Sequence, residues 1–276
     1  MTRKNMVHSR LGTDFIRKLS TKGDRIFTSD RGREIAPSVG ISEDYFNQML
    51  HHLTKAGWLV RIRKGLYALS STVPGVTPAH EYEIAMALVD PSAIAYWSAL
   101  NYHGLSDQIP RKVFIQTLKN VSIPRDRTKK VGQSQYQIEG FTYHFIQIKP
   151  ERFFGTEKVW VGEAKVTITD PERTLLDGLM MPYNCGDFSE VLSAFEIRKD
   201  NLEVKKIIDY ALKLDTAVAK RLGWVLEEME IDPNLLRPLE ELPIKGYRPL
   251  DPTNERKGPC NKRWRLQENL PGRINK

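Results

Sequence analysis

Polar side chains between residues 42 and 55 have the spacing of a helix face that contacts DNA bases. Four apolar residues recur at helical intervals, and at 100° per residue they leave the opposite face polar: Phe46, Met49, Leu50 and Leu53. The polar face and its flanks carry the candidate DNA contacts Ser42, Tyr45, Asn47, Gln48, His51 and Lys55. Asn and Gln pair bidentately with adenine, His bonds guanine or phosphate, and Lys anchors phosphate. The alternative is an ordinary solvated helix face.

Basic residues follow this segment in a second cluster. In a strand through residues 58–63, period-2 alternation predicts that Arg61 and Arg63 share one face, with Lys64 at a hairpin tip beside Gly65. Three cations on one exposed edge suit a phosphate backbone or a minor groove. The alternative is protection of an edge strand by charge. Upstream, near the start of a short helix, two further candidates for backbone contacts are Arg31 and Arg33.

Evidence for catalysis is thin. Glu163 and Lys165 have the E-x-K spacing of some metal-dependent nucleases, in which the carboxylate holds the metal. A charged strand edge is the favoured interpretation, because three residues match by chance often. Cys185 and Cys260 have no CxxC spacing and are expected to be reduced thiols. The sequence also lacks HExxH, Walker and dinucleotide glycine motifs, so we predict no metal, no cofactor and no enzymatic activity.

The charge distribution divides the chain into three parts. The 276 residues are 40% hydrophobic and 28% charged, which is enough apolar material for a core. Residues 1–70 hold 13 Lys and Arg against 6 Asp and Glu, and residues 248–276 hold 8 against 3. Residues 71–247 hold 21 against 25 and are slightly acidic. A basic N-terminal part indicates a polyanionic partner, most commonly nucleic acid.

The elements that must position the candidate residues read as a winged helix-turn-helix. Leu11 to Leu19 has helical spacing, and a short helix follows the N-cap residues 28–30. Gly40 and Ile41 make a tight turn before the helix that Ser42 begins. Two β-rich runs, residues 58–63 and 66–69, then flank a Lys-Gly turn. This order of helices and hairpin predicts a winged helix.

The rest of the chain predicts a larger α+β domain with central strands flanked by helices. A linker at residues 70–78 separates residues 1–72 from residues 73–276, with an extended basic tail from about residue 249. Helices are expected at 79–89, at 92–102 and from Pro171 to about Glu230. Strands are expected at 112–117, 133–138, 141–148, 159–161 and 165–169. Since no run of about 18 apolar residues and no secretory h-region occurs, we expect a cytoplasmic protein.

Three segments together resemble the AbiEi family of type IV antitoxins. They are residues 57–67, residues 95–105 with 113–117, and residues 168–179 followed by Cys185-Gly186-Asp187. The similarity extends from about Asp14 to Lys213, and the second and third segments are the specific ones. In these two segments we expect structural roles: core packing for Tyr96, Trp97, Leu100, Tyr102 and Leu105, a helix cap for Asp170, and an ion pair between Arg173 and Asp177.

The resemblance implies a DNA-binding autorepressor. Members of the family repress their own operon through an N-terminal winged helix that binds inverted repeats in double-stranded DNA. Their C-terminal domain is the antitoxin and counteracts a nucleotidyltransferase-like toxin without requiring a stable complex, and many such pairs act in abortive infection against phage. Two alternatives stay open from the residues: a winged-helix-tethered nuclease that uses Glu163 and Lys165, and a metabolite-responsive regulator.

Overall fold

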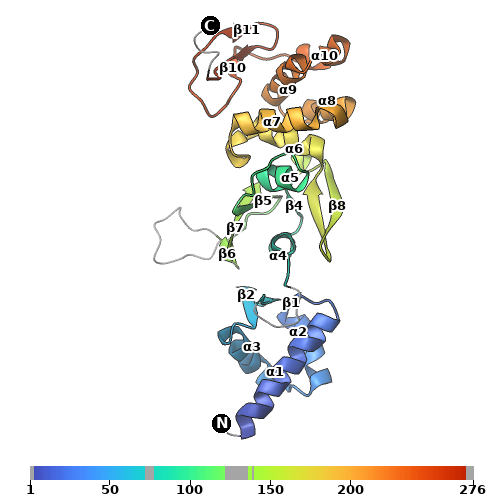
Figure 1. Cartoon of the computed structure of the whole chain (residues 1–276), viewed down its shortest axis with the longest axis vertical. Helices are drawn as coiled ribbons and strands as arrows, with labels where there is room; N and C mark the ends of the chain where they lie inside the picture. Colours follow the sequence, from blue (N-terminus) through green and yellow to red (C-terminus); the bar gives the residue numbers. More distant parts are fainter. Residues whose placement is uncertain (1–2, 72–77, 122–135, 139, 272–276) are drawn as a thin grey trace.

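The computed structural model describes residues 3–71, 78–121, 136–138 and 140–271, with side chains from Arg10 onward, and the molecule is elongated (Figure 1). The N-terminal end, here called the head (residues 3–71), contains three α-helices and a three-stranded sheet of order β1-β3-β2. These elements are α1 (Arg3–Thr21), β1 (Ile26–Thr28), α2 (Ser29–Ile35), a 3-10 turn (Ala36–Val39), α3 (Glu43–Lys55), β2 (Leu59–Arg63) and β3 (Leu66–Leu69). The α+β winged-helix prediction is thus confirmed, with β1 as an unpredicted addition.

Local signals set the boundaries of the head elements. Thr28 caps α2, because its hydroxyl accepts a hydrogen bond from the Arg31 N–H at 3.2 Å. Gly40 takes φ +79°, the left-handed conformation that lets the chain turn between the 3-10 segment and α3. Phe15, Phe27 and Phe46 pack edge-to-face in the middle of the head core. β1 escapes a sequence-based prediction because three residues are too few to show periodicity.

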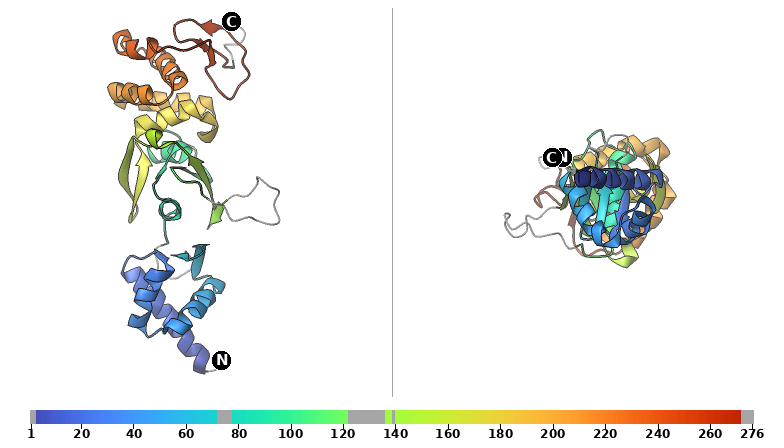
Figure 2. Two further views of the ribbon diagram at one scale, coloured as in Figure 1. Left: turned by 180° about the vertical axis from the view of Figure 1, so that it is seen from behind. Right: turned by 90° about the horizontal axis from the view of Figure 1, so that it is seen from below.

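The remainder, here called the body (residues 78–271), is built on a six-stranded mixed sheet of order β6-β7-β5-β4-β9-β8. Its strands are β4 (Ser92–Ile94), β5 (Lys112–Thr117), β6 (Tyr136–Ile138), β7 (Phe141–Gln147), β8 (Thr156–Val161) and β9 (Ala164–Thr169). Helix α4 (Glu81–Leu88) lies between the head and the sheet, and the remaining helices lie on the far side (Figures 1 and 2). Strands flanked by helices confirm the predicted architecture of the body.

One predicted helix of the body is wrong in its first turn. The expected helix over 92–102 is instead strand β4 followed by helix α5 (Tyr96–Tyr102). Ile94 pairs with Ile115 of β5 and with Ile168 of β9, so this segment is an inner strand of the sheet. A three-residue inner strand buried on both faces has no alternation that could separate it from a helix. Of the predicted hairpin 133–148, residues 133–135 and 139 lie outside the described residues.

The C-terminal helices form the largest apolar cluster of the described chain together with the tail. They are α6 (Pro171–Met180), α7 (Phe188–Arg198), α8 (Val204–Lys213), α9 (Thr216–Glu228) and α10 (Pro233–Glu240). The tail adds the short strands β10 (Arg248–Pro249), β11 (Cys260–Asn261) and β12 (Leu266–Gln267). Its Trp264 is fully buried against Gly223 of α9, where a β-carbon would collide with the indole. The tail therefore wraps over the body up to Pro271.

Buried polar groups of α6 hold this region together. Asp170 caps the helix by accepting from the Arg173 N–H at 2.8 Å, as predicted. Arg173 Nε donates to Asp177 Oδ1 at 2.9 Å, and both side chains are 1% exposed. Burial raises the pKa of Asp177, and the charge of Arg173 opposes that rise. Glu172 is likewise fully buried. These contacts confirm the structural interpretation of the segment.

The predicted aromatic stripe of α5 is only partly core. Tyr96, Leu100 and Leu105 are buried, whereas Trp97 is half-buried. Tyr102 is 37% exposed, so its assignment to the core is wrong. Both cysteines are free thiols, as expected. In the part of the chain that the structure describes, no helix is both long enough and apolar enough to cross a bilayer.

Candidate nucleic-acid interface

Helix α3 has the phase that its sequence predicts. Phe46, Met49, Leu50 and Leu53 are buried in the head core. The predicted DNA contacts lie on the other side, and Tyr45 is half-buried at the margin, while five are exposed: Ser42, Asn47, Gln48, His51 and Lys55. Ser42 occupies the N-cap position without a side-chain capping bond, so its hydroxyl is not committed to the helix end. The helix thus presents a polar surface of the type that enters a major groove.

Arg33 lies beside the N-terminal part of this surface and is held by several groups. Its Nε donates to Glu43 at 2.8 Å and its Nη1 to Asp30 at 3.2 Å. Its Nη2 donates to Asn47 Oδ1 at 3.4 Å, while the guanidinium stacks 5.3 Å from the centre of the Phe46 ring. Asn47 Oδ1 retains a second lone pair, so this contact orients the amide and leaves it able to pair with adenine. Because Glu43, Asp30 and Asn47 already hold its guanidinium, the geometry favours a positioning role for Arg33 over the predicted backbone contact.

The two roles of Arg33 predict different results for Arg33→Ala. If Arg33 positions Asn47, the variant loses affinity mainly for the specific site, by about 1 kcal/mol, which is the worth of one hydrogen bond. If Arg33 only contacts phosphate, affinity falls equally on random duplex. Anisotropy titrations of both duplexes measure the difference, and we expect the specific loss. Equal losses on the two duplexes would contradict the positioning role.

Arg31 is tied into the head itself. Its Nε and Nη2 donate to Asp24 at 3.1 and 3.0 Å, and its Nη1 donates to Glu34 at 2.9 Å. The bonds to Asp24 join α2 to the turn that precedes β1, whereas the bond to Glu34 lies within α2. A phosphate contact by Arg31 would compete with two carboxylates, so the structure places this candidate in a supporting position.

The two wing arginines do not share a face, so that part of the prediction is wrong. A β-bulge between them places Arg61 opposite Tyr67 and Arg63 opposite Leu66. Tyr67 packs against the head core, whereas Leu66 belongs to a cluster that includes body residues. Both arginines are exposed, and Lys64 lies in the turn between β2 and β3. Arg61 therefore points to the helical side of the wing and Arg63 to the side of the body.

The wing sheet has two apolar faces, and the body covers the second. Ile62, Leu66 and Ala68 of the wing lie in one cluster with Tyr82 and Ile84 of α4. The Tyr136 hydroxyl also donates to the Ile62 carbonyl at 2.6 Å. Figures 1 and 2 show the wing strands at the junction with the body. The wing sheet, which carries Arg61, thus packs directly against the body.

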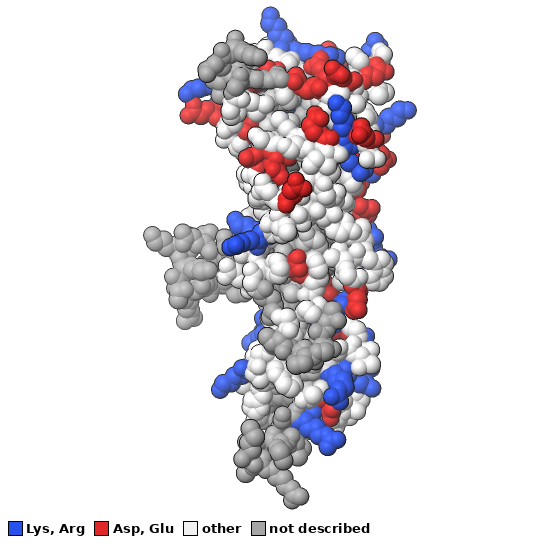
Figure 3. Space-filling view, viewed as in Figure 1, with Lys and Arg blue, Asp and Glu red and all other residues white. Residues whose placement is uncertain are grey.

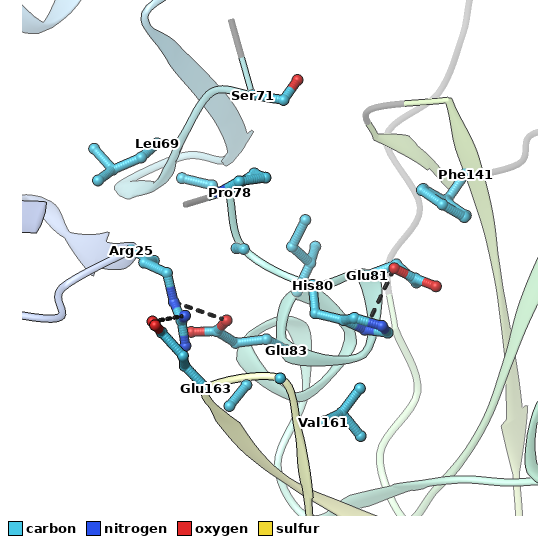
Figure 4. A pocket seen from close by; sticks show the side chains of 15 residues that line it. Arg25, Leu69, Ser71, Pro78, His80, Glu81, Glu83, Phe141, Val161 and Glu163 are labelled. Carbon is cyan, nitrogen blue, oxygen red and sulfur yellow. Dashed lines mark hydrogen bonds and ion pairs between the residues drawn. The ribbon is translucent and has the colours of Figure 1, made fainter. Parts of the chain in front are cut away.

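Arg25 makes an ionic contact across the same junction that no pattern in the sequence predicts. Its side chain, 10% exposed, donates to Glu163 at 2.7 Å and lies 3.4 Å from Glu83 (Figure 4). Burial raises the pKa of Glu83, with the charge of Arg25 opposing that rise. A pocket of about 350 Å³ opens beside this triad, between β3, α4 and the β8–β9 turn. An arginine in a basic head carries no local signal that its partners lie in a distant, acidic segment.

The catalytic alternative gains no geometric support. Glu163 is engaged with Arg25, whereas Lys165 lines a separate pocket with Lys158. Within the described ranges, no three His, Cys, Asp or Glu side chains are grouped as a metal site requires. Glu163 and Lys165 therefore do not converge on a common site.

Charge is distributed unevenly along the molecule (Figure 3). Acidic side chains gather over the C-terminal helices in this view, and basic side chains prevail over the head. In the sequence the same contrast appears as 13 Lys and Arg against 6 Asp and Glu in residues 1–70. A polyanion is thereby drawn to the end of the molecule that carries α3 and the wing.

Comparisons with known proteins agree with this geometry. Residues 31–70 match the family described as transcriptional regulator, AbiEi antitoxin, which confirms the resemblance over α2, α3 and the wing. The fold is similar to that of the crystal structure of the RV2827C protein from Mycobacterium tuberculosis, with a TM-score of 0.69 and 13% identity. The alignment covers 93% of this chain and 90% of that chain. No curated protein matches the sequence.

Proposed function

We propose, from the match of residues 31–70 to the AbiEi antitoxin family of transcriptional regulators, that this chain represses its own operon by binding inverted repeats in duplex DNA. The observation that carries the proposal is the exposed polar face of α3 next to a basic wing. The side chains proposed to contact bases are Asn47, Gln48 and His51, and those proposed to contact phosphates are Lys55, Arg61, Arg63 and Lys64. Such binding would take place in the cytoplasm.

The binding experiment uses the full chain and the DNA upstream of its gene. We expect steep salt dependence: with about 5 phosphates contacted, log K falls with log salt at a slope of about −4 to −5. The variant Arg61→Ala should flatten this slope by about 1 and weaken specific and random duplex alike. The matched control is Lys205→Ala, which removes an exposed lysine of α8 in the body. A slope near zero would contradict binding through the head.

We further propose that the body is an antitoxin directed against a nucleotidyltransferase-like toxin in a type IV, phage-defence system; the support is the antitoxin description of the family that matches residues 31–70 of the head. The double variant Arg61→Ala, Arg63→Ala should lose repression and still rescue cells that express the toxin. Both side chains are exposed, so their removal leaves the shared core intact. A two-plasmid growth assay with a promoter reporter measures both activities, after soluble expression is checked. Loss of rescue in the folded variant would contradict two separable functions.

A metabolite-responsive regulator is the second candidate, and the pocket at the junction favours it. Arg25, Glu83 and Glu163 line this pocket, so a ligand there would contact the groups that join the head to the body. A metabolite-responsive regulator would be distinguished from the other candidates by a change in operator affinity when a metabolite is added to the purified chain. The nuclease alternative predicts metal-dependent nicking, which Glu163→Gln would abolish.

A further inference from the structure

An exposed tryptophan lies on the outer strand of the body sheet. Trp160 of β8 is 66% exposed, the most exposed tryptophan of the described residues. Tryptophan side chains are large and apolar, and at surfaces they mark contact sites. β8 is an edge strand, yet a charged residue would protect an edge better than an indole. Trp160 is therefore a candidate contact residue, and its neighbours decide which ligand would fit it.

Two lysines share the sheet face of Trp160. Lys165 of β9 pairs directly with Trp160, and Lys158 lies two residues before it on β8. Directly opposed residues and residues at i, i+2 point to the same face of a sheet. Both lysines are exposed, and among the described residues no carboxylate lies within ion-pair distance of either. Two like charges on diagonal positions repel each other, and an anion between them would relieve that repulsion.

A small polar pocket connects these side chains to α4 and β4. It has a volume of about 210 Å³, and its lining is Met86, Asp90, Ser92, Lys158, Lys165 and Thr167. The Ser92 hydroxyl donates to the Val89 carbonyl at 2.6 Å, so its proton is committed. Thr167 pairs with Lys158 across the ladder and lines the pocket together with both lysines. The pocket thus combines two cations and a hydroxyl with one carboxylate, Asp90.

We propose that this face of β8 and β9 binds a ribonucleotide unit. The phosphate lies between Lys158 and Lys165, and the base stacks on Trp160. Asp90 accepts a hydrogen bond from a ribose hydroxyl, which is a role for the carboxylate that a simple anion site would not have. Stacking on an aromatic face and ion pairing with the backbone are the two components of single-strand recognition.

The site is distinct from the operator-binding head. An indole stacks on a base only when that base is outside a duplex, since paired bases are covered by their neighbours in the helix. Two sources supply the ligand chemistry: a free ribonucleotide and a single-stranded RNA. Both present a phosphate, a ribose and an unstacked base, and the experiment distinguishes them.

The test uses the full chain with Arg61→Ala and Arg63→Ala as background, so that the wing contributes little. ATP is titrated by calorimetry, and a fluorescein-labelled twelve-residue oligoadenylate RNA by anisotropy. For whichever probe binds more tightly, we expect Trp160→Ala to lower the affinity at least fivefold and Trp160→Phe to retain most of the affinity. Lys158→Ala with Lys165→Ala should weaken it similarly and flatten the salt dependence. Matched controls are Tyr183→Ala, an aromatic 62% exposed elsewhere, and Lys205→Ala.

Some outcomes distinguish a free ribonucleotide from a single-stranded RNA, and others overturn the proposal. Tighter binding of ATP identifies a free-nucleotide site, and tighter binding of the oligonucleotide identifies a single-strand site. In either case Trp160→Ala should leave binding of the duplex operator unchanged in the otherwise natural chain. The proposal is overturned if neither probe binds with a Kd below about 1 mM, which corresponds to a binding free energy of about −4 kcal/mol. It is also overturned if Trp160→Ala, with unchanged melting temperature, binds as Tyr183→Ala does.

Discussion

The double variant Asn47→Ala, Gln48→Ala is expected to lose about 2–6 kcal/mol of binding free energy on the specific operator, because each bidentate base contact contributes about 1–3 kcal/mol. On random duplex the loss should stay small, since phosphate contacts dominate non-specific binding. Both side chains are exposed on α3, so their truncation leaves the head core unchanged. Anisotropy titrations on the operator and on a shuffled duplex give the two affinities.

Asp44→Ala serves as the matched control, since Asp44 is also exposed on α3 and is a poor partner for a phosphate-rich surface. It should retain or improve the affinity for both duplexes. A uniform loss in the Asn47 and Gln48 variant would mean that these amides contact the backbone. The proposed orientation of α3 in the groove would then be wrong.

Asp177→Ala is expected to lower the free energy of unfolding by about 3–5 kcal/mol, because it leaves the buried Arg173 guanidinium without its carboxylate. The two side chains are each 1% exposed, so water cannot solvate the orphaned charge. Arg173 would keep its hydrogen bonds to the carbonyls of Arg152 and Phe154, which do not neutralise it. Urea unfolding followed by tryptophan fluorescence measures the change.

The control for this prediction is Glu34→Ala. It removes one exposed ion pair with Arg31 and should cost less than about 1 kcal/mol. Asp177→Asn preserves the shape and one hydrogen-bond acceptor, so its loss should fall between the two. An Asp177→Ala variant as stable as Glu34→Ala would show that the pair contributes no net stability.

Local patterns predicted the head well because each of its helices has its own apolar stripe and its own boundary signal. The stripe through Phe46 and Leu53 determined the phase of α3, and with it the exposed candidates. The bulge that separates Arg61 from Arg63 could not be predicted, since a single inserted residue in a five-residue strand leaves no periodic trace. The packing of the wing against α4 could not be predicted either, because the periodicity of a strand does not indicate which element covers its apolar face.

Contacts distant in sequence account for the remaining differences. β4 is a strand because Ile94 lies between β5 and β9, and its partners are 21 and 74 positions away. The sequence alone predicts that Arg33 contacts the DNA backbone, because its hydrogen bonds to Glu43 and Asn47 become visible only in the folded structure. Periodicity reports which side of an element is apolar, whereas it does not report which element covers that side.

The apolar cluster that the wing shares with α4 has a consequence for engineering and for recombination. A chimera that joins this head to another body at the linker would transplant Ile62, Leu66 and Ala68 without the surface that covers them. The graft would expose the apolar face of the wing sheet that α4 covers here, and it would be expected to aggregate. With DNA contact through α3 as proposed, a change of target would instead require point substitutions on the exposed face of α3, which has no residue in the cluster shared with α4, and the head and body would be kept together.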